Sequence, residues 1–166
     1  QPTISPSMDI QISSNFERLL FDLFDRDGDR VRATMEEFRE SGTFSIDNKV
    51  LESAQVLFYG ARFGDEATKQ TIYDIYEESG ELIDPHTAVG IAAARAQRRD
   101  QNVPMIALAT AHPAKFPDAV KDATGQLPAL PDRLSDLLDG EERCDVMSND
   151  LDLVRDYISN NAGAVA

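Results

Sequence analysis

Apolar residues recur along most of this chain at the spacing of an α-helix, and this periodicity constrains the fold more than any other feature. Phe16, Leu19, Leu20, Leu23 and Phe24 fall three or four positions apart, so they form one apolar stripe on a helix. Glycine, proline and aspartate residues separate this stretch from others of the same kind. The sequence therefore predicts a series of short amphipathic helices.

Capping residues set the expected ends of these helices. Asp84-Pro85 is a strong helix start, because an acidic N-cap precedes a proline at the first helical position. Gly42, Gly80 and Gly125 are expected stops. We predict helices over residues 14–27, 31–41, 48–57, 65–80, 85–96, 117–125, 134–140 and 148–158, with Asp47 or Asn48, Asp65 and Ser148 as further N-caps.

One segment breaks the helical pattern. Met105 to Thr110 is a short apolar run after Pro104, which is typical of a buried strand. The expected fold class is therefore α/β, mostly helical with a few short strands. The 166 residues are expected to form a single domain.

The charge of the chain excludes several classes of partner. Asp and Glu number 30 against 16 Lys and Arg, which gives a formal net charge of −14. Such a surface repels phosphate backbones and anionic lipids, so neither a nucleic acid nor a membrane is an expected partner. The longest apolar run, at residues 105–109, is far shorter than the roughly 18 residues that a membrane span needs.

The cysteine content and the first residues bear on location. A single cysteine, Cys144, excludes an internal disulfide and favours a reducing, cytoplasmic compartment, where we expect a partly buried and inert thiol. The chain begins with Gln1-Pro2 rather than Met and has no signal-peptide pattern. We expect it to be a piece of a longer protein.

Two segments carry groups that could bind an anion or a ligand. Ser13, Ser14, Asn15 and Arg18 place hydroxyls, an amide and a guanidinium at a helix start, which suits an oxyanion, although plain N-capping explains them equally well. Thr110, His112 and Lys115 follow the expected strand, and strand ends commonly face ligand crevices. The alternative is that Thr110 ends the strand, His112 caps a helix and Lys115 is solvated.

Other chemistry is disfavoured. Asp25 to Asp29 resembles a calcium loop, but the glycine that the loop needs at its sixth position is replaced by Arg30, so a solvated turn is expected. His86 and His112 lack the spacing of zinc ligands, and no metal site is predicted. His86 itself is expected to be a surface residue beside a helix cap.

Three segments together resemble the C-terminal part of bacterial-type threonine synthases, over essentially the whole chain. These are Thr3-Ile-Ser-Pro-Ser-Met-Asp-Ile-Gln-Ile-Ser-Ser-Asn-Phe-Glu-Arg-Leu19, Asp84-Pro-His-Thr-Ala88 and Ala109-Thr-Ala-His-Pro-Ala-Lys-Phe116. The resemblance implies a tryptophan-synthase-like (fold type II) enzyme that uses pyridoxal 5'-phosphate. It further implies the conversion of O-phospho-L-homoserine and water to L-threonine and phosphate.

The resemblance also assigns roles to residues. Thr110 is expected to face the pyridine nitrogen of the cofactor, with His112 lining the same opening. Ser13, Ser14, Asn15 and Arg18 are expected to hold the substrate or its phosphate. The family's Schiff-base lysine motif and glycine-rich phosphate loop are not in this chain, and Lys49, Lys69, Lys115 and Lys121 lie outside any such motif.

The chain alone is therefore expected to be inactive, not to retain the cofactor, and to need the remainder of the same polypeptide as its partner. Two alternatives stay open. One is an acidic helical interaction module without catalysis, and the other is a related lyase that uses the same cofactor on a different amino acid.

Overall fold

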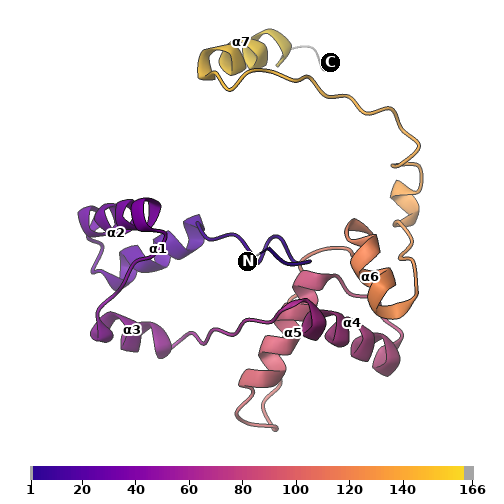
Figure 1. Ribbon diagram of the computed structural model, residues 1–166, viewed down its shortest axis with the longest axis horizontal. Coiled ribbons are helices and arrows are strands. Elements are labelled where there is room, and N and C mark those ends of the chain that lie inside the picture. Colours follow the sequence, from indigo (N-terminus) through magenta and orange to yellow (C-terminus); the bar gives the residue numbers. More distant parts are fainter. Residues whose placement is uncertain (1, 163–166) are drawn as a thin grey trace. The chain divides into compact units, whose positions relative to one another are not determined.

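The computed structural model describes residues 2–162, which are helical with connecting loops (Figure 1). The chain divides into two compact units, Gln1–Ala129 and Leu130–Ala166. The first unit contains α1 (Ser14–Leu23), α2 (Gly28–Ser41), α3 (Asn48–Gln55), α4 (Asp65–Ser79), α5 (Pro85–Gln97), the 3₁₀-helix η1 (Pro113–Lys115) and α6 (Pro117–Thr124). The second contains the 3₁₀-helix η2 (Asp132–Leu134) and α7 (Leu151–Asn161).

Helix α1 packs against α2 and α3 around a small apolar core. Leu20 and Phe24 of the predicted stripe meet Met35 and Val50 in this core. Burial of these side chains supplies the main favourable free energy for this group, because removal of apolar surface from water drives folding. The helical spacing of the sequence therefore identified the correct face of α1.

Helix α4 packs against both α5 and α6 (Figure 1). Ile72 of α4, Ala88 of α5 and Val120 of α6 are completely buried. The side chain of Ala88 is a single methyl group that occupies little space, so neighbouring helices can approach closely. This group positions the first turn of α5.

Several predicted helix ends are confirmed. Asp47 and Asp84 cap α3 and α5, and their carboxylates accept hydrogen bonds from backbone N–H groups of the first turn. Gly42, Gly80 and Gly125 end α2, α4 and α6 with φ values of 74°, 75° and 73°. This left-handed conformation favours glycine, which has no Cβ to clash with the neighbouring carbonyl.

The α/β assignment is wrong, because the part of the chain that the structure describes contains no strand. Residues 105–109 are exposed rather than buried, with Ile106 82% and Leu108 75% accessible. A strand exists only when a neighbouring strand pairs with its backbone, and residues 2–162 supply none. An apolar run alone does not reveal whether such a neighbour is present.

Smaller predictions are also corrected. The helix expected over residues 134–140 is reduced to η2 and the turns that follow it. Gly64 rather than Asp65 caps α4, and Asp150 rather than Ser148 caps α7. Cys144 is exposed rather than partly buried, because residues 141–149 form no regular element that could cover it.

Candidate functional site

The first turn of α5 holds the most concentrated group of buried polar side chains. Asp84, His86 and Thr87 are each no more than 4% exposed. The Asp84 carboxylate accepts hydrogen bonds from the backbone N–H of His86 at 2.9 Å and of Thr87 at 3.4 Å. The cap therefore directs three neighbouring polar side chains into the protein instead of into solvent.

His86 joins this turn to the N-terminal loop. Its Nδ1 lies 2.9 Å from Asp84 Oδ1, and its Nε2 accepts the backbone N–H of Ser7 at 3.1 Å. The Ser7 bond assigns the acceptor role to Nε2, so the ring proton belongs on Nδ1, facing Asp84. The ring also packs on Phe116, with centroids 4.6 Å apart. The expected surface position of His86 is wrong, because loop and aromatic partners distant in sequence cover it.

Thr87 links the same cap to Thr110. Its hydroxyl donates to Asp84 Oδ2, and its oxygen accepts the backbone N–H of Thr110 at 3.1 Å. Thr110 is exposed, and no described residue forms a hydrogen bond with its hydroxyl. The main chain of Thr110 is thus anchored while its side chain stays available.

The positions of His112 and Lys115 agree with the alternative in which His112 caps a helix and Lys115 is solvated. His112 Nδ1 accepts the N–H of Ala114 at 3.2 Å, which makes His112 the cap of η1. Both side chains are exposed. His112 lies two residues after Thr110. Its hydrogen bond to Ala114 therefore holds the imidazole near Thr110 in the sequence.

The residues predicted to hold an anion lie at the start of α1. Ser13 occupies the N-cap position, but its side chain makes no capping hydrogen bond. Arg18 donates to the amide oxygen of Asn15, so the guanidinium lies over the first turn of α1. These side chains are exposed, and no hydrogen bond among the described residues joins them to Thr110 or His112. The structure therefore places the two predicted groups without bringing them together.

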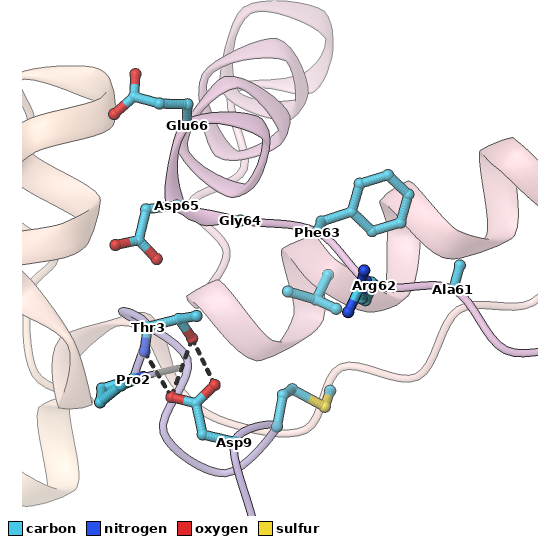
Figure 2. A pocket seen from close by; sticks show the side chains of 11 residues that line it. Pro2, Thr3, Asp9, Ala61, Arg62, Phe63, Gly64, Asp65 and Glu66 are labelled. Carbon is cyan, nitrogen blue, oxygen red and sulfur yellow. Dashed lines mark hydrogen bonds between the residues drawn. The ribbon is translucent and has the colours of Figure 1, made fainter.

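A hollow of about 800 Å³ lies between the N-terminal loop and the start of α4 (Figure 2). Asp9 accepts hydrogen bonds from Thr3, at 2.7 Å from the backbone N–H and 2.9 Å from the hydroxyl. Asp65 accepts the N–H of Ile4 at 3.0 Å. These carboxylates hold the loop that carries Ser7, and through Ser7 they support His86.

None of the four lysines has the environment of a nucleophile, which would be a buried and unpaired amine. Lys69 pairs with Asp122 of α6 at 2.6 Å, and that contact raises the pKa of Lys69 above its ordinary value. A lysine that attacks a carbonyl must lose its proton, so this pair works against such a role. The others, Lys49, Lys115 and Lys121, are exposed.

Sequence reasoning missed the partners of Thr110. Asp84 was identified only as a cap, and Thr87 was not singled out as a candidate, although both stand in the segment Asp84 to Ala88 that carries part of the resemblance. The hydrogen bond between Thr87 and Thr110 spans 23 positions, and Asp84 reaches Thr110 only through Thr87, so no local pattern reports this arrangement. No helix in the described part of the chain has the length and apolar character to cross a membrane.

Comparisons with known proteins agree on one family. A family model described as "Threonine synthase, C-terminal" matches residues 87–158. A threonine synthase of Pseudomonas aeruginosa is 50% identical over 161 residues, which cover 96% of this chain and 34% of that protein. A threonine synthase of Corynebacterium glutamicum is 40% identical over 94% of this chain and 33% of its own length.

A solved structure gives the same result. The crystal structure of a PLP-bound threonine synthase from Brucella melitensis matches with a TM-score of 0.83 and 46% identity. The match covers 96% of this chain and 34% of that one. This chain thus spans about a third of the length of the relatives that it matches.

Proposed function

We propose that this chain, which corresponds in sequence and structure to the C-terminal part of threonine synthases, contributes to a pyridoxal-phosphate enzyme that makes L-threonine from O-phospho-L-homoserine and water. Support comes from the names of the relatives and from similarity along nearly all of the chain. Since the chain spans only about a third of those relatives, the reaction belongs to the longer protein.

The observation that carries the proposal is the placement of Thr110. Its N–H is anchored by Thr87, and its hydroxyl is exposed without a partner among the described residues. Pyridoxal phosphate, when bound, supplies the electron sink that stabilises carbanions. A hydroxyl beside its ring nitrogen can share a hydrogen bond without fixing a positive charge there, whereas a carboxylate would hold a proton on the nitrogen.

The residues present suit one side of the cofactor only. Thr110 offers the hydroxyl, and His112 lies two residues away with its imidazole held by Ala114. The lysines offer no matching nucleophile, because Lys69 is paired with Asp122 and the others are solvated. We therefore assign the Schiff-base lysine and the cradle for the cofactor phosphate to the rest of the longer protein, so that this chain alone is inactive.

We assign the start of α1 to the substrate. Backbone N–H groups at the N-terminus of a helix favour negative charge, and a guanidinium strengthens the attraction to phosphate. Ser13, Ser14 and Asn15 supply polar groups there, and Arg18 is held over the same turn by Asn15.

The single cysteine accords with a cytoplasmic site of action, where phosphorylated metabolites are available.

The test compares phosphate release from O-phosphohomoserine by the longer protein with that of its Thr110→Val variant. We expect a loss of about 10- to 100-fold in kcat, because the variant removes the group that faces the reacting ring. Thr34→Val in α2 is the matched control, since this half-buried threonine bonds only to the carbonyl of Arg30 within its own helix.

Other outcomes separate the alternatives. Full activity in Thr110→Val would remove Thr110 from the cofactor site while keeping the enzyme. Absence of both activity and cofactor absorbance in the longer protein would favour an acidic interaction module, in keeping with the charge of −14. Activity on a different amino acid, with none on phosphohomoserine, would indicate a related lyase.

A further inference from the structure

We propose that Asp84 and Thr87 form a positioning relay that fixes the backbone of Thr110, and thereby the place of its hydroxyl beside the cofactor ring. This inference rests on the proposed function, because Thr110 is the residue assigned there to the cofactor. Asp84 and Thr87 are positioning residues, which act through Thr110 and do not touch the cofactor.

The Thr87 hydroxyl is engaged in both directions. Its oxygen accepts the N–H of Thr110 at 3.1 Å, and its proton is donated to Asp84 Oδ2. A hydroxyl has one proton, so donation to the carboxylate turns a lone pair toward Thr110. By accepting this proton, Asp84 leaves the Thr87 oxygen as an acceptor, and the N–H of Thr110 needs an acceptor.

Asp84 is itself held in one orientation. The carboxylate is completely buried and accepts hydrogen bonds from the backbone N–H groups of His86 and Thr87, from the His86 ring and from the Thr87 hydroxyl. A buried acceptor left without its donor costs free energy, so rotation of this carboxylate is opposed by the loss of all of these hydrogen bonds. Ser7 holds the far side of the His86 ring.

The hydrogen bond from the Thr110 N–H to Thr87 is the one backbone tether of the segment around Thr110 among the described residues. Between Pro104 and Ala111 the described residues make no other hydrogen bond, and residues 105–109 are exposed. Without the Thr87 contact, no hydrogen bond among the described residues would restrain the main chain at Thr110. The tether uses the N–H and leaves the hydroxyl of Thr110 free.

The test uses Thr87→Val in the longer protein with bound cofactor. Valine keeps the shape of threonine but cannot accept the Thr110 N–H. We expect amide hydrogen exchange at Thr110 to become about 2- to 10-fold faster, the equivalent of one lost hydrogen bond. We expect kcat to fall about 10- to 100-fold through misplacement of the Thr110 hydroxyl, with a much smaller change in KM.

Two further variants separate positioning from general damage. Thr71→Val is the matched control, because Thr71 is also buried but bonds only to the carbonyl of Ala67 within α4. Thr87→Ser retains the hydroxyl and should restore both exchange and kcat to within about 3-fold of the unchanged protein. If Thr87→Val fails to fold, Asp84→Asn tests the same relay, since an amide nitrogen at Oδ2 would donate to Thr87 instead of accepting from it.

A double-mutant cycle decides whether Thr87 acts through Thr110. The combined Thr87→Val and Thr110→Val variant should be no slower than Thr110→Val alone, because the relay has nothing left to position. Additive losses would overturn the relay, as would unchanged exchange at Thr110 in Thr87→Val. Full activity of Thr110→Val alone would instead contradict the assignment of Thr110 to the cofactor, on which the relay rests, so the two failures are distinguishable.

Discussion

Aspartate side chains begin several of the helices, and this use accounts for part of the acidic composition. Asp27, Asp84 and Asp150 each accept two backbone N–H groups from the first turn of α2, α5 and α7, and Asp47 accepts one from α3. A negative charge at this end of a helix also interacts favourably with the helix dipole. Asp47 has a second contact, since its Oδ2 lies 2.7 Å from Arg30 of α2.

The pKa of Asp47 provides a test at the scale of one residue. The N–H of Val50, and then Arg30, hold this pKa below its ordinary value. A carboxyl group with a lower pKa in the folded state stabilises the fold above its unfolded-state pKa, and the effect disappears as pH falls through the folded-state pKa. We expect Asp47→Asn to lower the Tm at neutral pH, and the difference from the unchanged chain to vanish toward acidic pH.

The difference should be small, because the Asp47 side chain is 54% exposed and solvent screens its charge. Asp136→Asn is the control, since Asp136 is exposed and its side chain forms no hydrogen bond among the described residues. A Tm difference for Asp47→Asn that stayed constant across the acidic range would contradict the assigned cause.

Residue positions were predictable where their causes are local. Asp84 and Pro85 are adjacent in sequence, and the glycine that ends a helix lies one position beyond it, so both signals can be read directly. The burial of His86 was not predictable in this way. It depends on Ser7 and Phe116, which lie 79 positions before and 30 positions after it, and only the folded chain brings these groups to the ring.

Helices were also easier to predict than extended segments, for the same physical reason. A helix satisfies its backbone within itself, so α2 and α4 can be recognised from the spacing of their residues and from the glycines that end them. An extended segment must find its hydrogen-bond partners elsewhere. Residues 105–109 therefore have an apolar pattern typical of a strand, although no strand pairs with them in the described part of the chain.

Packing of α4 between α5 and α6 leads to a prediction at the scale of these elements. Ile72 is completely buried in α4, so Ile72→Ala should create a cavity and lower the free energy of unfolding by about 2–5 kcal/mol. Alanine is a strong helix former, which means that the loss would report packing and not helix propensity. Urea unfolding followed by circular dichroism measures the change.

Val56→Ala provides the comparison for Ile72→Ala. Val56 follows α3, and it is 77% exposed, so its truncation should change the free energy of unfolding by less than about 0.5 kcal/mol. Equal effects of the two substitutions would show that Ile72 does not lie in a packed core.

At the scale of the whole molecule, apolar exposure and negative charge oppose each other. Large apolar side chains are exposed in both units, among them Ile106 and Leu108 in the first and Leu138 and Val146 in the second. Extensive exposed apolar surface favours association. The net charge of −14 favours separation, because like-charged chains repel.

Salt therefore controls the balance in the isolated 166-residue chain. Raising the ionic strength to about 1 M shortens the screening length to about 3 Å, which removes most of the repulsion and leaves the apolar attraction in place. We expect sedimentation velocity to show self-association that increases with salt. The variant with Ile106→Lys and Leu108→Lys should associate less at every salt concentration, since it removes two of the most exposed apolar side chains.

The two lysines also make the chain less negative, and a second pair of substitutions separates this effect from the loss of apolar surface. Replacing Glu141 and Glu142, which are exposed, by Gln makes the chain less negative without removing apolar surface, and should increase association at low salt. The lysine variant also makes the chain less negative, yet it should decrease association. A compact monomer at all salt concentrations would show that the exposed apolar side chains do not drive contacts between copies of this chain.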